Sequence, residues 1–417
     1  MEHSTAQLNS ENDVPLLWNL SLFSFVVAGI TGFSYRLGMI GRIPLNLSME
    51  NIRHAHSHLM LFGWAVPLPL YVVFRYLRPK LSGNVPAITL MRNSIAAGLF
   101  LGLLAYPFFL LFGYQPVPIG STNLPLSVIL AGFVMVSWYC FMVGYLKARN
   151  VLANDSIQPW FDSALVMLLV CSLGAWGVAL LQAIDPTNQL LVKAMTHFFL
   201  ATFTEGWVVL IVVAVVLSRI KKRDIKWPLS PHLLIGCIVL GAPLTFPYGI
   251  SKSTLPSLLL GTARFGGALT ALSLVLILFG VLRTQKLKTT VWIWPIGLLG
   301  FKALMQLAAA ILPSSFWLAD HGLQIFYLHV LLLGALTLTI SGFLYELADA
   351  SRVFFNLFAG AVTLAILSLI LLTRFWPQIW SGPWIFKMVA AVAILPVLAA
   401  MALWIKLIKT KQNEVYA

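Results

Sequence analysis

The composition of this chain excludes a soluble globular protein. Of its 417 residues, 59% are hydrophobic and 10% are charged, and the mean hydropathy is +0.90. A soluble domain carries about a quarter charged residues, whereas here apolar runs of about 20 residues, long enough to cross a bilayer as helices, recur along the sequence. The net charge of +14 does not indicate nucleic-acid binding, because most basic residues fall in loops on one predicted side of the membrane. We therefore expect an all-α polytopic membrane protein.

The transmembrane domain is predicted to cover residues 15–407, between a polar N-terminal tail (1–14) and a C-terminal tail (408–417). The first apolar run lacks a basic n-region and a small-residue cleavage site, so we interpret it as a span and not as a signal peptide. The three cysteines lie inside apolar runs without a Cys-x-x-Cys motif, which disfavours disulfides, covalent heme attachment and thiolate zinc sites. The twelve predicted spans are 15–38, 55–75, 93–113, 125–146, 161–183, 193–218, 229–249, 256–282, 290–312, 319–345, 352–373 and 384–407.

The basic residues predict the orientation of these spans. Loops that follow even-numbered spans, together with the C-terminal tail, hold most of them, including Lys221, Lys222 and Arg223 after the sixth span and Lys286 and Lys288 after the eighth. By the positive-inside rule both termini face the cytoplasm. Even-numbered spans therefore enter the membrane from its outer face, as expected of a multi-pass protein of a bacterial-type inner membrane.

Histidines recur on three of the even-numbered spans. Imidazole is costly in hydrocarbon and binds metals well, so this recurrence indicates a bound metal or heme. All of these histidines are expected in the outer part of the membrane, and because a helix rises about 1.5 Å per residue, His58, His197 and His329 should differ in depth by roughly two turns at most. One site could take ligands from all three spans. The histidines are His54, His56 and His58 on the second span, His197 on the sixth, and His321 and His329 on the tenth.

Helical periodicity divides these histidines between faces. At about 100° per residue, His54 and His58 share one face while His56 points nearly the opposite way. A single intramembrane histidine bonded to a backbone carbonyl or a serine is also a common structural feature. The coincidence across three spans favours metal or heme binding, most strongly for His58 and His329, which are the best pair for a bis-imidazole heme. His56 is the alternative on the second span.

The sequence also resembles known families. Twelve spans with histidines on the second, sixth and tenth are similar to subunit I of the heme–copper oxidases, and the stretch from His54 to Trp64 is similar to a motif of the NnrS family. Segments beginning at His197 (His-Phe-Phe…Gly-Trp) and at His329 (His-Val-Leu-Leu-Leu-Gly) resemble those of uncharacterised bacterial oxidase-like proteins. The resemblance implies a low-spin heme held by histidines of the second and tenth spans.

The sequence also departs from these families, chiefly at the residues that would hold a second metal. The oxidases hold copper with a span-6 histidine and an adjacent His-His pair, and this chain has no His-His dipeptide. Where many of them have a tyrosine four residues after the span-6 histidine, this chain has Ala201. The arginine-bearing segment of NnrS proteins is missing as well. We therefore expect a divergent heme protein without a standard oxygen-reducing centre.

Charged and polar residues within other spans are further candidates. Lys302 and Gln306 share a helix face on the ninth span, and Glu205 follows His197 by eight residues. Glu205 could handle protons or bind a metal, and Arg264, Lys302 or the interfacial Arg53 could pair with heme propionates. Structural ion pairs between helices are an equal alternative. The glycines of the two Gly-Trp pairs, Gly63-Trp64 and Gly206-Trp207, would let a helix or a flat macrocycle approach closely, and helix packing is the commoner reason for such glycines.

Two functions fit these observations. The first is an oxidase-like membrane protein with heme b and, as a further ligand group, copper or another second metal held by residues such as His54, His197, His321 and Glu205. It would transfer electrons, or sense or process nitric oxide or oxygen, with a quinol or a separate protein as electron donor. The second is a proton-coupled or metal-ion secondary transporter without heme, in which the histidines, Glu205 and Lys302 carry the coupling.

Overall fold

The protein is described by a computed structural model that covers residues 2–42, 47–81, 84–153, 155–185, 187–219, 225–250, 256–283, 291–314, 320–347 and 352–416. Side chains are described within these ranges between residues 16 and 405, Leu347 excepted. The basic residues predicted to mark the cytoplasmic side at Lys221, Lys222, Arg223, Lys286 and Lys288 lie outside the described residues.

The described chain contains twelve helices long and apolar enough to cross a membrane, which confirms the all-α polytopic fold. Residues 2–14, which belong to the predicted polar tail, continue the first helix on its N-terminal side. The second span begins at Met49, so the whole histidine cluster is helical. The spans are Leu16–Gly38, Met49–Lys80, Val85–Phe112, Leu126–Leu152, Gln158–Ile184, Gln189–Arg219, Pro231–Gly249, Ser257–Leu282, Ile293–Ile311, His321–Glu346, Arg352–Leu372 and Trp384–Ile405.

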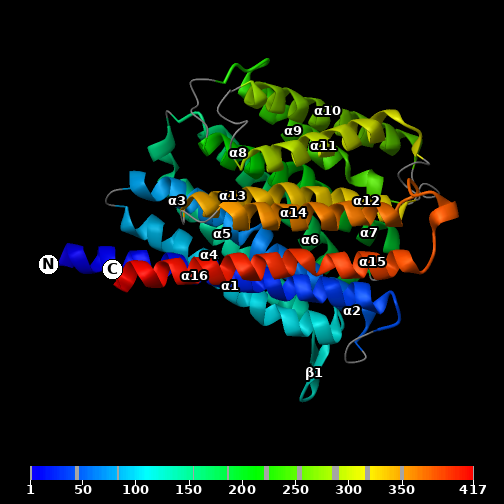
Figure 1. The fold of residues 1–417 in the computed structure, drawn as a ribbon, viewed down its shortest axis with the longest axis horizontal. Coiled ribbons are helices and arrows are strands. Elements are labelled where there is room, and N and C mark those ends of the chain that lie inside the picture. Colours follow the sequence, from blue (N-terminus) through cyan, green and yellow to red (C-terminus); the bar gives the residue numbers. More distant parts are fainter. Residues whose placement is uncertain are drawn as a thin grey trace. The chain divides into compact units, whose positions relative to one another are not determined.

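The chain divides into two compact units. Unit 1 comprises residues 1–151, 345–365 and 381–417. In it α1 packs against α2, α15 and α16, and α4 packs against α5 (Figure 1). A short hairpin of β1 and β2, which pairs Val117 with Leu124, joins α4 to α5. Its elements are α1 (Glu2–Gly38), α2 (Met49–Met60), η2 (Leu61–Ala65), α3 (Pro67–Leu77), η3 (Arg78–Lys80), α4 (Val85–Phe112), β1 (Val117–Ile119), β2 (Thr122–Leu124), α5 (Leu126–Ala148), η4 (Arg149–Leu152), most of α14 (Arg352–Ser368), α15 (Trp384–Ala393) and α16 (Leu395–Tyr416).

Unit 2 comprises residues 152–344 and 366–380. Within it α6 packs against α7, α10 packs against α9 and α11, and α11 packs against the middle of the tenth span. Its elements are α6 (Gln158–Ile184), α7 (Gln189–Ala201), η5 (Thr202–Val208), α8 (Val209–Arg219), α9 (Pro231–Leu244), η7 (Phe246–Gly249), α10 (Ser257–Leu282), α11 (Ile293–Ile311), α12 (His321–His329), η11 (Val330–Leu336), most of α13 (Thr337–Leu347), η12 (Leu369–Leu372) and η13 (Gln378–Trp380).

The three spans that carry the predicted histidine ligands share an irregular feature. Each contains a π-helical segment shortly after its histidine: η2 after His58, η5 after His197 and η11 directly after His329. Among the described residues these are the π-helical segments of the chain. A π-turn adds one residue to the helical repeat, and such turns frequently mark functional sites. The recurrence on every fourth span is a structural repeat that the sequence did not reveal.

The same three spans are also the most buried. In their most apolar windows, spans 2, 6 and 10 are 83%, 89% and 61% buried, against at most 56% for each other span. The more exposed helices carry large apolar side chains on their surfaces, such as Phe100, Leu240 and Leu258, each more than 60% exposed. Apolar exposure on this scale indicates a lipid bilayer as the environment of the chain.

Candidate functional site

His54 and His58 lie together on one face of α2, as the helical periodicity predicts. The ring of each contacts Tyr114, which follows α4, and the ring centroids of His54 and Tyr114 are 4.5 Å apart. Nε2 of His54 lies 3.4 Å from Oε1 of Glu50, one turn earlier on α2. This face therefore joins an exposed carboxylate, two imidazoles and a phenol within unit 1.

The ring of His58 is already engaged by protein groups. Its Nε2 lies 2.7 Å from the Tyr114 hydroxyl, and its face stacks on Phe109 at 4.0 Å between ring centroids. Burial raises the pKa of Tyr114 to about 12, so the phenol keeps its proton at neutral pH. Nδ1 of His58 is buried and has no hydrogen-bond partner among the described residues. A buried imidazole nitrogen that lacks a donor costs less than a buried N–H that lacks an acceptor, which favours the proton on Nε2.

His56 faces the opposite side of α2, toward α1. Its Nδ1 lies 2.7 Å from the carbonyl oxygen of Ala28. A carbonyl oxygen can only accept, so Nδ1 carries the proton and, in the neutral ring, Nε2 carries the lone pair. Gly32 permits this approach, because a Cβ at that position would lie 2.7 Å from Cε1 and 2.8 Å from Nδ1 of His56.

His329 ends α12 and shows the same arrangement within unit 2. Its Nδ1 lies 2.8 Å from the carbonyl oxygen of Ile325, so the proton is again on Nδ1 and the lone pair on Nε2. His321, at the other end of α12, is exposed and follows the helix cap Asp320. The predicted pair His58 and His329 is therefore divided between the two units, and each histidine is described within its own unit.

His197 lies on α7, where it packs closely against the backbone of η7. A Cβ on Gly249 would lie 1.9 Å from Nδ1 of His197, so glycine is required for this contact. None of the residues of α7 is buried, whereas every residue of η5 immediately after it is buried. The histidine-bearing half of the sixth span is therefore more exposed than its second half.

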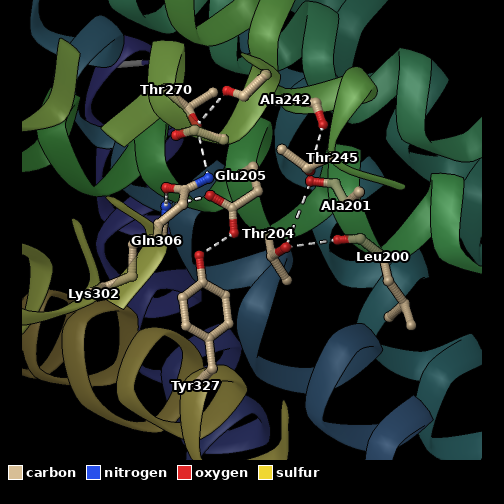
Figure 2. Close-up of polar contacts among 12 residues, drawn as sticks. Leu200, Ala201, Thr204, Glu205, Ala242, Thr245, Thr270, Lys302, Gln306 and Tyr327 are labelled. Carbon is tan, nitrogen blue, oxygen red and sulfur yellow. Dashed lines mark hydrogen bonds and ion pairs between the residues drawn. The ribbon is translucent and has the colours of Figure 1, made fainter. Parts of the chain in front are cut away.

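Glu205 belongs to a buried polar network that joins four spans of unit 2. Its Oε2 accepts a hydrogen bond from Nζ of Lys302, and its Oε1 accepts one from the hydroxyl of Tyr327 at 2.5 Å. Nζ of Lys302 also donates to Oε1 of Gln306 at 2.6 Å, which confirms that these two residues share a face of α11. Nε2 of Gln306 donates to Oγ1 of Thr270 on α10 at 2.7 Å, and Figure 2 shows the resulting chain.

The two arginines expected near heme propionates have protein partners. Arg53 is exposed and its Nη2 lies 3.5 Å from Oε1 of Glu50. Nη2 of Arg264 donates to the carbonyl of Leu312 at the end of α11, at 3.0 Å, while its Nε is buried without a partner among the described residues. A cation at a helix C-terminus is favourable on its own account, so this contact supports a structural role for Arg264 as well.

The Gly-Trp pairs serve helix packing. Gly63 lies against Ser24 of α1 and Gly206 against Met167 of α6, at distances that leave no room for a Cβ. Both tryptophans are buried.

Among the described residues, no three histidine, cysteine, aspartate or glutamate side chains are gathered closely enough to hold a metal ion by themselves. No sequence pattern marks Tyr114, Tyr327 or Thr270, each of which completes a polar contact described above. Tyr327 precedes His329 by two residues, but nothing local in the sequence indicates its contact with the sixth span. Gly32 and Gly249 were missed for the same reason.

The fold and these contacts define an integral membrane protein with polar groups concentrated on and around its three most buried spans. Comparison with models of known protein families gives no match, and a search of curated proteins gives none either.

Proposed function

We propose that this chain is an integral membrane heme b protein, with His56 of the second span and His329 of the tenth span as its candidate ligands to the heme iron. The supporting observation is the tautomer of the two imidazoles, which a backbone hydrogen bond determines in each. In each, Nδ1–H donates to a backbone carbonyl, so Nε2 is the nitrogen with the lone pair that a metal would bind. Histidines that bind metals in proteins commonly have this second hydrogen bond, which orients the ring and fixes its tautomer.

The same criterion ranks the other histidines of the second span. Nε2 of His54 lies near the exposed Glu50. His58 has the arrangement of His56 with the two nitrogens exchanged, because its Nε2 is engaged by the side chain of Tyr114 and not by a backbone carbonyl. His58 remains the runner-up, because its buried Nδ1 is without a partner among the described residues. His329 of the tenth span meets the same criterion within unit 2, because its Nδ1–H donates to the carbonyl of Ile325.

We assign this protein electron transfer, or the sensing or processing of nitric oxide or oxygen, at a bacterial-type inner membrane with both termini in the cytoplasm. A bound heme supplies one-electron chemistry and, where a coordination position is open, a binding place for a diatomic gas. Reducing equivalents would come from a quinol or a separate electron-donor protein. His197 is the residue of the sixth span from which a second metal, such as copper, would draw a ligand, because both carboxylate oxygens of Glu205 are engaged by Lys302 and Tyr327.

The test is the absorption spectrum of the purified full-length protein, oxidised and reduced. We expect a Soret band and sharp reduced bands, with loss or shift of these bands in His56→Ala and His329→Ala. His58→Ala should retain them, as should His232→Ala, an exposed histidine of α9 that serves as control. A colourless preparation from heme-replete cells would contradict the proposal. Loss of the bands in His58→Ala but not in His56→Ala would move the ligand to His58.

A secondary transporter is the second candidate, and the buried pair of Glu205 and Lys302 favours it. Charges inside membrane spans often lie on ion or proton pathways. If the protein is a transporter, liposomes that contain the heme-free protein should take up a divalent cation in exchange for protons. Uptake that is absent from the wild type, or equal in wild type and Glu205→Gln, would exclude this function for the pair.

A further inference from the structure

The hydrogen bonds around Glu205 have a fixed direction. Thr270 donates its hydroxyl proton to the carbonyl of Gly266, at 3.0 Å, so its oxygen is the acceptor for Nε2 of Gln306. The amide oxygen of Gln306 is thereby turned toward Nζ of Lys302, 2.6 Å away. The ammonium group of Lys302 therefore has a second acceptor that does not depend on Glu205 (Figure 2).

Charged or titratable groups of three other elements face the carboxylate of Glu205. Lys302 of α11 donates to one oxygen and Tyr327 of α12 donates to the other. Tyr248 of η7 lies within electrostatic range of Glu205, and also of Arg264 on α10. Lys302, Tyr327 and Tyr248 are thus the charged or titratable groups that the described residues bring to this carboxyl, with Arg264 beyond Tyr248.

Stability alone does not account for this arrangement. Lys302 is 1% exposed and Glu205 is 4% exposed. A buried ion pair is expensive to desolvate, and replacing one with packed apolar side chains is often neutral or stabilising. Apolar residues would tie these spans together equally well. A second acceptor for Lys302 becomes useful when Glu205 loses its charge.

We propose that Glu205 is an exchangeable proton-binding site. Without the proton, the carboxylate and the ammonium group of Lys302 carry a net charge of zero. A proton that arrives from water forms an O–H bond on the carboxyl group, no electron moves, and the pair then carries one positive charge. Lys302 remains charged because Gln306 continues to accept its hydrogen bond. Glu205 lies within η5, and a π-helical segment is a frequent location for functional side chains.

The site does not depend on a bound heme, so it can be tested separately from the proposed function. The experiment is infrared difference spectroscopy of the purified full-length protein in lipid, with the pH stepped in H2O and in D2O. We expect the carbonyl band of a protonated carboxylic acid to appear as the pH falls and to shift in D2O. The band should be lost in Glu205→Gln and retained in Glu50→Gln, which removes an exposed carboxylate.

A second variant keeps the test decisive if Glu205→Gln does not fold. Tyr327→Phe leaves the carboxyl in place but removes one of its hydrogen bonds, so the band should persist at a shifted frequency. Lys302→Met removes the cation that opposes protonation and should leave the band present at neutral pH. A protein that shows no such band at any pH, or a band that none of these substitutions alters, would establish a fixed ion pair and overturn the proposal.

Discussion

Nδ1 of His56 on α2 lies 2.7 Å from the carbonyl oxygen of Ala28 on α1, and this contact sets the tautomer of the imidazole. The contact depends on Gly32, one turn further along α1, whose missing Cβ leaves room for the ring. The candidate ligand is therefore positioned by a helix that contains no histidine within its membrane span.

Substitution of Gly32 tests this positioning. A Cβ in Gly32→Ala would lie 2.7 Å from Cε1 of His56, so the ring must move away from Ala28. Overpacking of this kind typically costs about 1–3 kcal/mol of stability. We expect a shifted or weakened heme spectrum and a lower melting temperature. Gly360→Ala on α14 is the matched control, because no atom lies within 4 Å of the added Cβ. Equal spectra for the two variants would argue against His56 as ligand.

Removal of the Tyr114 hydroxyl tests the role assigned to His58. Tyr114→Phe deletes the hydrogen bond to Nε2 of His58, and a neutral hydrogen bond contributes about 0.5–1.5 kcal/mol. We expect a loss of stability in this range with an unchanged heme spectrum. A spectrum that changes as strongly as that of His56→Ala would instead place His58 at the iron.

The same tyrosine makes a prediction about pH. Burial raises the pKa of Tyr114 from 10.0 to about 12, so the folded protein holds this proton more tightly than the unfolded chain. The stability that follows from this shift is fully present below pH 10 and is lost as the pH rises through 12. In an alkaline titration followed by tyrosinate absorbance, the wild type should show a component that titrates near pH 12, and Tyr114→Phe should lack it. A component lost near pH 10 would show that Tyr114 is not buried.

The sequence predicts those features that depend on local periodicity. Hydropathy located the twelve spans, and helix geometry placed His54 with His58 and Lys302 with Gln306. The π-helical segments were not predictable in this way, because one extra residue in a turn does not alter the hydropathy of a span. The contacts of Tyr327 and Tyr114 join residues 122 and 56 positions apart, and only tertiary packing determines them.

The buried ion pair predicts strongly non-additive effects on stability. Lys302→Met leaves the carboxylate of Glu205 without its cation, and breaking a buried pair from one side typically costs about 3–5 kcal/mol. The double variant Glu205→Leu/Lys302→Met removes both charges and should recover most of that loss. Unfolding in denaturing detergent measures the coupling as a double-mutant cycle. Glu50→Gln, which breaks an exposed contact with Arg53, should cost less than about 1 kcal/mol. Additive effects of the two buried substitutions would show that Glu205 and Lys302 do not interact.

The contact between Gly249 and His197 makes the last prediction, which concerns the sixth span. In Gly249→Ala the added Cβ would lie 1.9 Å from Nδ1 of His197, so the imidazole or the η7 backbone must move. If His197 binds a second metal or faces a bound gas, Gly249→Ala and His197→Ala should both lose that metal or change the spectral response to nitric oxide. Gly236→Ala on α9, where the added Cβ meets no atom within 4 Å, should behave as the wild type. Loss of stability in Gly249→Ala with unchanged metal content and gas response would assign His197 to packing, because the displaced ring would then matter to the fold and not to a ligand.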